Sequence, residues 1–545
     1  MMMTHPKTDP IKASDILARY QRARERRTTW ESHWQECYDF ALPLRDGSLI
    51  AGQAGEKKAD HLFDGTAPDA VDQLAASLLG HLTPPGGHWF GLNAGPNVTD
   101  ESREEMADEL DQVSRVLQTH FDRSNFTVEM HQCYLDLVTV GTACLQFEEA
   151  AIGDSSAFRF TAVPLGQVVL EDGGNGRLDV VYRRAELTSG QFKVRFPEAS
   201  LPEDLRRRQE ENPDELIPVV EAVIPEDGTY AYWAILETED GVDGEPAILR
   251  QGRFAHSPFI AFRWVKSPGE NYGRSPVMKA LPDIKTANKV VELILKNASI
   301  TVTGIWQADD DGVLNPATIK LAPGTIIPKA VGSAGLTALK APGELQTSQI
   351  VLETLRTNIR RALLADKLGP VDGPKMTATE VVERAGDMSR LLGATFGRLQ
   401  AELLNPLLMR AQAILRRRGE IPNLRIDGRE VVLRYQSSLI RDAAHEEAQK
   451  ISLWIRTLGE IGADVQTIVD ISAAARWLGR AFDIPEELVR APGEVPKEPT
   501  LPSQPSLPSD PAALAGANGT ELMTQALGAV LPAVTGQASG GSHGT

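Results

Sequence analysis

Two helical stretches near the middle of the chain constrain its fold most, because each has a narrow apolar face. The first begins at Ser275-Pro276, where we expect the serine to cap the first free amides and the proline to occupy the first turn. It runs to about residue 298 with apolar positions at alternating steps of four and three residues, and Asn288 fills one step: Val277, Leu281, Ile284, Val291, Leu295 and Ala298. The second has a similar face: Leu345, Leu352, Leu355, Ile359 and Ala362. This spacing predicts helices that pack lengthwise against partner helices.

The segments before and between these helices differ in periodicity. Apolar steps of three and four residues predict helices over about 9–40, 66–82, 101–122 and 127–140, the first ended by Pro43. Short β-type runs bounded by Gly, Pro and Asp then predict strands over 143–148, 158–163, 168–171, 180–184, 230–236 and 259–264. A smaller β-type insert, about 300–342, separates the two central helices. The predicted fold class is therefore α+β and largely helical.

The segment after the central helices begins with a predicted loop. Two Gly-Pro pairs within residues 367–376 break any helix there. A capping box at 377–380 predicts a long helix that runs to about Arg418 and is kinked at Pro406. Its glycines at 386, 393 and 397 share one face, which favours close approach of another backbone; scattered, tolerated glycines are the alternative.

The C-terminal part is predicted to end in disorder. A strand at 431–435 precedes helices over about 441–458, 465–471 and 473–482. Proline then recurs at every third position from Pro499 to Pro511, and the following residues carry a single charged side chain, Glu521. Such a composition cannot bury a core, so we expect this tail to be disordered.

Composition narrows the function classes. The 545 residues predict about three or four folding units. The net charge of −18 argues against a protein that grips nucleic acid over its whole surface. The three cysteines, Cys37, Cys133 and Cys144, show no metal-site or disulfide pattern, so we interpret them as buried apolar groups in a reducing compartment. No secretory signal or membrane-spanning stretch is found, which predicts synthesis in the cytoplasm.

The motifs that would indicate an enzyme are incomplete. No phosphate-binding P-loop motif occurs, and the glycines at 173–176 are interpreted as a turn. The start of a zinc-protease motif at His445-Glu446 lacks the second histidine, because Gln449 stands there. The acidic run 309–312 lacks the outer ligands of a calcium loop and is interpreted as a solvated turn. We therefore expect no catalytic residues, no metal and no cofactor.

Lysines offer two candidate surfaces for DNA. Lys285, Lys289 and Lys296 share a face of the first central helix and could face phosphate. Glu292 lies on that face too, so an ion-paired, solvated helix face or a subunit contact is the simpler interpretation. Lys367 and Lys375 bracket the Gly-Pro loop, where loose DNA contact and plain solvation are both open.

Several local sequences resemble one family. They are Phe63-Asp64-Gly65-Thr66-Ala67, Leu78-Leu79-Gly80-His81-Leu82-Thr83-Pro84-Pro85, Trp89-Phe90, Lys375-Met376-Thr377-Ala378-Thr379-Glu380-Val381 and Leu403-Leu404-Asn405-Pro406-Leu407. Together with the order of segments, they resemble the portal proteins of bacteriophages, the head-to-tail connectors of short-tailed, podovirus-type phages. The resemblance covers about residues 10–495.

The resemblance implies a portal-type ring subunit with named regions. Residues 1–274 would form the wing, 275–299 and 345–366 the two stem helices, and 300–344 the clip between them. Residues 367–376 would be the tunnel loop, 377–440 the long wing helix with its return strand, and 441–491 the crown. The Pro-rich tail, 492–545, lies outside the resemblance.

The family also implies function and partners. It implies a ring of about twelve copies at one capsid vertex of the virion, assembled in the cytoplasm of the host bacterium. Double-stranded DNA would pass through it during packaging and ejection, and the terminase packaging motor, a tail adaptor, and capsid and scaffold proteins would bind it. Lys285, Lys289, Lys296, Lys367 and Lys375 are candidate DNA-channel residues, and the apolar faces from Val277 to Leu295 and from Leu352 to Ile359 are candidate stem contacts.

Ile305 and Trp306, in the predicted clip, are candidate contacts for motor or tail; packing in the subunit's own core is the alternative. Two other functions stay open: a different virion ring, such as a tail adaptor or internal scaffold, and an enzyme of unrecognised type.

Overall fold

The computed structural model describes part of the chain, and all of the described residues belong to the unit Met1–Phe482. They are residues 12–45, 58–174, 176–199, 202–212, 214–237, 246–303, 306–308, 331–332, 336–338, 345–365, 393, 395–423, 431–435, 448, 450–458, 460–461 and 468–481. The predicted loop 367–376, the capping box at 377–380 and the Pro-rich tail lie outside these residues.

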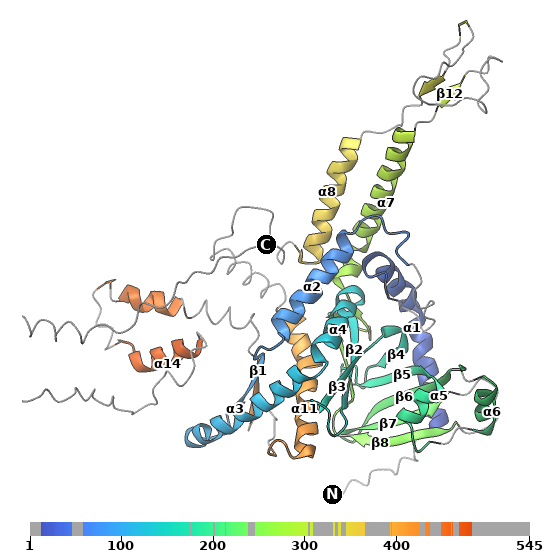
Figure 1. Cartoon of the computed structure of the whole chain (residues 1–545). Helices are drawn as coiled ribbons and strands as arrows, with labels where there is room; N and C mark the ends of the chain where they lie inside the picture. The colour runs from blue at the N-terminus through green and yellow to red at the C-terminus, as the bar shows by residue number, and fades with distance from the viewer. Residues whose placement is uncertain are drawn as a thin grey trace, which may run out of the picture. The chain divides into compact units, whose positions relative to one another are not determined.

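Four helices form the N-terminal part, within a few residues of the predicted bounds. They are α1 (Ala13–Ala41), α2 (Thr66–Leu82), α3 (Asp100–Arg123) and α4 (Phe126–Val140) (Figure 1). As predicted, α1 ends before Pro43: the Leu42 amide makes the last helical hydrogen bond, to the Tyr38 carbonyl at 2.8 Å. The second half of α4 is buried on every side, which places it at the centre of the core.

Two antiparallel sheets follow in the region predicted to be β-type. In the first, β2 (Thr142–Glu149) lies between β3 (Phe158–Val163) and β9 (Phe259–Arg263). The second runs in the order β4 (Val168–Glu171), β5 (Val180–Leu187), β6 (Ile217–Glu226), β7 (Thr229–Leu236), β8 (Ile248–Phe254). All six predicted strands are therefore present. The short helices α5 (Ser189–Arg195) and α6 (Glu203–Glu211), and strands β6 and β8, were not predicted.

Strand β6 escaped prediction because its residues suggest a loop. Pro218 and Pro225 lie near its two ends and a glutamate, Glu221, lies at its centre. Proline and an unpaired charge both disfavour a central strand. The structure resolves the conflict by pairing Glu221, which is 2% exposed, with Arg195 at 2.9 Å and with the Tyr232 hydroxyl at 2.7 Å.

The central strands of the five-stranded sheet, β6 and β7, are buried on both faces, whereas the edge strand β8 is mostly exposed. Side chains alternate between the main core, which holds Val181 and Val223, and a second cluster, which holds Tyr182 and Val220. The N-terminal half of α1 covers the second cluster, where Tyr20 packs against Tyr182 with ring centroids 5.8 Å apart. Strands β6 and β7 are accordingly mostly apolar, and the charged side chains of the sheet lie mainly on β5 and β8.

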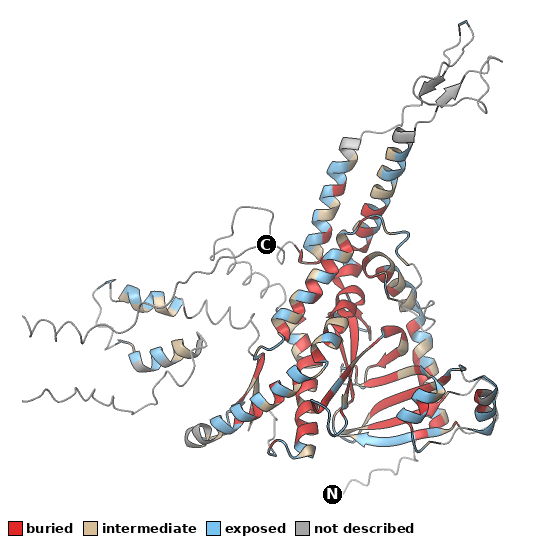
Figure 2. Ribbon diagram, viewed as in Figure 1, coloured by how far each residue is buried: buried red, intermediate tan, exposed pale blue. Residues whose placement is uncertain are grey.

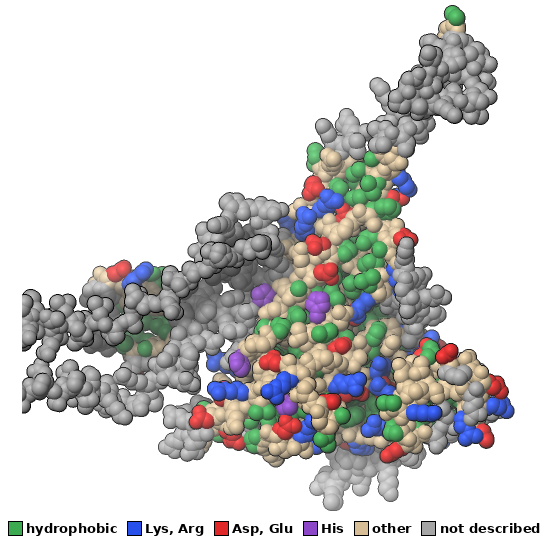
Figure 3. Space-filling model, in the orientation of Figure 1, with side chains coloured by type: hydrophobic (Ala, Val, Ile, Leu, Met, Phe, Trp, Pro, Cys, Tyr) green, Lys and Arg blue, Asp and Glu red, His purple; other side chains and the backbone are tan. Residues whose placement is uncertain are grey.

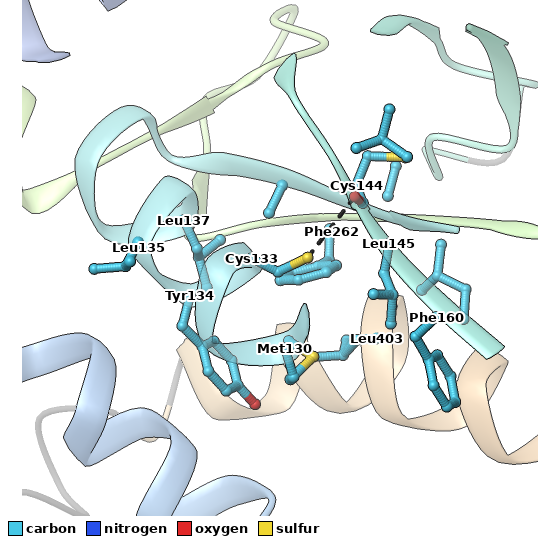
Figure 4. Close-up of a cluster of buried hydrophobic side chains, with 14 of the residues drawn as sticks. Met130, Cys133, Tyr134, Leu135, Leu137, Cys144, Leu145, Phe160, Phe262 and Leu403 are labelled. Atoms are coloured by element: carbon cyan, nitrogen blue, oxygen red, sulfur yellow. Dashed lines mark hydrogen bonds between the residues drawn. The ribbon is translucent and has the colours of Figure 1, made fainter. Parts of the chain in front are cut away.

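The cysteines lie inside the main core, as interpreted from the sequence. Figure 4 shows Cys133 on α4 directed toward the Cys144 carbonyl on β2, with 3.8 Å between the thiol sulfur and that oxygen. All three thiols are free and buried, and burial raises the pKa of Cys144 to about 12. They therefore pack as small apolar groups.

The two central helices are α7 (Pro276–Thr303) and α8 (Leu345–Ala362), and they pack side by side (Figure 1). Between them, β12 (Trp306–Ala308) pairs antiparallel with β13 (Leu336–Ala338), so the predicted insert does contain β structure. Near the C-terminal end, β14 (Val431–Tyr435) pairs with β1 (Phe90–Ala94), and the last described helix is α14 (Ile471–Ala481).

Pro406, where a kink is predicted, lies just after a stretch that leaves α geometry. A π-helical turn, Gln400–Leu404, leads directly into α11 (Asn405–Arg418), with Pro406 in the first turn of α11. A proline lacks the amide that an uninterrupted α-helix needs, and a π-turn is a common site of bending. Glu402 of that turn pairs with the buried Arg263 on β9 at 2.5 Å, which joins the helix to the first sheet.

Candidate functional site

Helix α7 begins where α4 and β9 meet. Ser275 caps it as predicted: its Oγ accepts from the Met278 amide at 2.9 Å and donates to the Thr139 carbonyl of α4 at 2.8 Å. Gly141, with φ +78°, ends α4, and a Cβ there would lie 2.6 Å from the Gly273 carbonyl oxygen. Only glycine permits both that backbone conformation and this close approach. The end of α4 therefore packs directly against the backbone that leads into α7.

A polar junction holds the middle of α7. Asn288, which the sequence placed within the apolar face, is 7% exposed. Its Oδ1 accepts from the backbone amides of Phe63 at 2.6 Å and Asp64 at 3.0 Å, and its Nδ2 donates to the His61 carbonyl at 2.9 Å. One side chain thus satisfies three backbone groups of the segment before α2.

The same segment is joined to α8 through Asp64. The Arg356 guanidinium donates to Asp64 Oδ2 at 2.9 Å, and the Thr66 amide donates to Oδ1 at 3.0 Å. Burial acts to raise the pKa of Asp64, but the hydrogen bonds from Thr66 and Arg356 outweigh it and hold the pKa below its usual value. We call Asn288, Asp64 and Arg356 the polar junction. It connects α7, α8 and the start of α2.

Burial along the helix pair changes at this junction (Figure 2). In α7 the predicted contact residues Val277, Leu281 and Ile284 are buried, and in α8 Leu352 and Ile359 are buried. Beyond Asn288 no described side chain of α7 is fully buried: Val291 is half-buried and Leu295 is 53% exposed. Leu355 of α8 is half-buried as well.

The far half of the pair exposes apolar side chains. Leu293, Leu295, Ile350 and Val351 are 53%, 53%, 69% and 46% exposed. We call these four residues the exposed stem face; Figure 3 shows hydrophobic side chains along this part of the helix pair. Within the described part of the chain nothing else covers them, and such a face is typical of a surface that another chain contacts.

The lysines of α7 are ion-paired, as the simpler interpretation expected. Glu292 accepts from Lys289 at 2.9 Å and from Lys296 at 2.5 Å, and Lys285 pairs with Glu36 of α1 at 3.2 Å. All three lysines are exposed. Their positive charge is thus partly balanced within the chain.

The other predicted contact residues lie in parts of the chain, or have side chains, that the structure does not describe. Lys367, Lys375 and Ile305 lie outside the described residues. Trp306 is the first residue of β12, opposite Ala338, and its side chain is not among those described.

Two kinds of site are not found in the described ranges. No three His, Cys, Asp or Glu side chains there are arranged to hold a metal ion. None of the helices in that part of the chain combines the length and apolar character needed to cross a bilayer.

Sequence reasoning missed the polar junction. The sequence Phe63-Asp64-Gly65-Thr66 and the break in the apolar face at Asn288 were both visible, but nothing in the sequence indicated that they are in contact. A lone asparagine in an otherwise apolar helix face was the available signal, because a buried amide needs partners.

These features define a mixed helix-and-strand protein. Its helix pair α7–α8 has buried apolar side chains in the half next to α2 and exposed ones in the other half. A comparison with known families identifies it more closely: residues 13–489 match the family model of bacteriophage head to tail connecting proteins. The chain belongs to this family.

Individual relatives are distant but cover most of the chain. It is 24% identical over 491 residues to the "Probable portal protein" of Bordetella phage BPP-1, covering 86% of both chains. It is 23% identical to the "Portal protein" of Enterobacteria phage T3, covering 77% of this chain and 78% of that one. A chain in a solved structure titled "Virion of native gene transfer agent (GTA) particle" is 14% identical, with a TM-score of 0.37 over 79% of this chain and 96% of that one.

Proposed function

We propose that this chain is a phage portal protein, a non-enzymatic subunit of a ring at one vertex of the capsid. The family match and the portal relatives support the class. The exposed stem face is the observation that supports ring formation, because its four apolar side chains are exposed to solvent within the described part of the chain. A neighbouring copy would bury them.

The regions of the subunit follow the family plan in this proposal. Residues 1–274 and 377–440 form the wing, α7 and α8 the stem, 300–344 the clip, 367–376 the tunnel loop and 441–491 the crown. A ring of about twelve copies then encloses a channel for double-stranded DNA, with the packaging motor and the tail adaptor bound at the clip through Ile305 and Trp306. Scaffold and capsid proteins contact the outside.

The charge of the chain suits a channel for sliding DNA. A net charge of −18 per copy disfavours long-lived phosphate binding over an extended surface. Lys367 and Lys375 in the tunnel loop, together with Lys285, Lys289 and Lys296, are the proposed local DNA contacts. Their number is small beside the acidic total, so we expect brief contacts.

Assembly of the purified chain tests the ring directly. Mass photometry and negative-stain microscopy should show rings of about twelve copies with a central hole wide enough for duplex DNA. The Leu295→Asp/Val351→Asp variant should stay monomeric, because two charges would be buried in the interface. Val128→Asp is the matched control, since Val128 is 64% exposed on α4. Rings formed by the double variant would show that the exposed stem face is not the contact.

A further inference from the structure

A cavity of about 1220 Å³ lies away from the stem helices, and arginine dominates its lining. Residues of both sheets, α5 and α11 surround it. Seven arginines and four carboxylates face it: Arg159, Arg183, Arg195, Arg250, Arg410, Arg417 and Arg418, with Glu148, Glu149, Asp154 and Glu186. The excess of cations is opposite in sign to the net charge of −18 of the whole chain.

Arg410 is the most buried of these cations, at 6% exposure. Its guanidinium donates to the backbone carbonyls of Phe147 and His256, each at 2.7 Å, and lies over the rings of Phe147 and Phe254. It makes no ion pair with any carboxylate of the described chain. Burial and the nearby Arg417 lower the pKa of Arg410 to about 10. A buried cation without a counter-ion would be stabilised by an anion in the cavity.

Three further arginines leave donors unpaired. Arg183 uses one terminal nitrogen on Gln146, at 2.5 Å, and the same nitrogen is ion-paired with Glu221 at 3.5 Å, so only its buried Nε has no hydrogen-bond partner among the described residues. Arg159 and Arg250 are exposed and form no ion pair within that same set. The remaining arginines are already paired, Arg195 with Glu221 and both Arg417 and Arg418 with Glu149.

The rim of the cavity adds an apolar component. Ile152 is 98% exposed and Val194 is 84% exposed, and both line the cavity, as do Tyr232, Phe254 and Phe259. A free phosphate or a nucleic-acid backbone would use the arginines alone. A peptide that carries carboxylates beside apolar side chains would use both components.

We propose that this cavity is the docking site for an acidic peptide segment of a protein partner, with carboxylates that pair with Arg159, Arg250 and Arg410 and apolar side chains that pack on Ile152 and Val194. The volume accommodates several side chains of such a segment. The site is separate from the exposed stem face, because no residue of α7 or α8 lines it.

Selection from a random twelve-residue peptide library, displayed on yeast and presented to the purified full chain, tests the proposal. Enriched peptides should contain at least two Asp or Glu residues next to an apolar residue. Fluorescein-labelled copies of them should lose roughly ten-fold or more in affinity for the Arg159→Glu/Arg250→Glu variant, because two attractive charge pairs become repulsive. Both residues are exposed, so the variant should fold normally.

Controls separate this site from general attraction to positive charge. Arg115→Glu is the matched single control, because Arg115 is an exposed arginine on α3, with a side chain 71% accessible. It should bind the selected peptides like the wild type. Enrichment without acidic residues, or equal binding to the charge-reversed variant, would overturn the proposal. Tripolyphosphate or a duplex oligonucleotide that binds more tightly than the peptides, with the same dependence on Arg159 and Arg250, would also overturn it in favour of a phosphate site.

Discussion

The two halves of the α7–α8 pair differ in burial, although one apolar spacing runs through both halves of α7. In the half near α2, apolar side chains are buried within the chain and the polar junction ties three segments together. In the far half, the same spacing leaves Leu295 53% exposed, and Leu293, Ile350 and Val351, which lie off that spacing, are exposed as well. Periodicity therefore predicts that a helix face packs, but not whether its partner is in the same chain.

The difference has an energetic consequence that can be measured. Side chains in the near half should determine the free energy of unfolding of a single copy, because their partners are present in the monomer. Side chains in the far half should affect assembly and leave that free energy almost unchanged. Four substitutions test this comparison in urea, on monomeric protein, in order of falling effect on monomer stability.

Asn288→Leu should have the largest effect. It removes the acceptor for the Phe63 and Asp64 amides and the donor for the His61 carbonyl, and so leaves the buried Asp64 amide and two part-buried backbone groups without their partners. We expect a loss of about 2–4 kcal/mol in the free energy of unfolding. Thr286→Ala, on the exposed side of the same helix, is the control and should cost about 0.5 kcal/mol or less. Equal losses in the two variants would mean that the junction adds no specific stability.

Arg356→Ala should follow, with a loss of about 1–3 kcal/mol at neutral pH, since it leaves a buried carboxylate without its cation. The Asp64 side chain is only 3% exposed. Because the folded-state pKa of Asp64 is depressed, its contribution is present above the unfolded-state pKa and is lost as pH falls through the folded-state value. The difference between wild type and variant should therefore shrink under acid conditions.

Glu353→Ala is the control for that variant, because Glu353 also accepts from Arg356, at 3.0 Å, but is exposed. It should change stability little at any pH. A pH-independent difference between wild type and Arg356→Ala would show that Arg356 acts through packing of its side chain and not through Asp64.

The parts of this region that were predicted from sequence are those set by local chemistry. Helix α7 starts at Ser275-Pro276 because capping involves residues three positions apart, and α1 ends near Pro43 for a similarly local reason. Strand β6 was missed because the cation that permits Glu221 at its centre lies on α5, 26 residues away. Asn288 was noticed, but its partners lie more than 220 residues away in sequence. Pairings at such distances carry no periodic signal.

Lysine substitutions on α7 should have a smaller effect than those at the junction. Glu292 accepts hydrogen bonds from Lys296 and Lys289, which hold its pKa below the usual value. The two lysine side chains are 61% and 65% exposed, so salt at about 0.15 M screens these ion pairs. Replacing both lysines with Gln should leave the urea midpoint of the monomer unchanged within error. A clear fall in that midpoint would show that these lysines stabilise the monomer, as the side chains of the near half are expected to do.

Leu295→Asp/Val351→Asp sharpens the comparison most, because the expected effect on the monomer is also small while the effect on assembly is complete. Both side chains are about half exposed, at 53% and 46%, so a charge there stays in contact with water in a single copy. We expect the free energy of unfolding to change by about 0.5 kcal/mol or less. Val277→Asp, at the fully buried start of α7, is the opposite control and should unfold the monomer, because its charge has no water and no partner. If the double variant lost as much stability as Val277→Asp, the exposed stem face would be packed within its own chain, and the distinction between the two halves of the helix pair would fail.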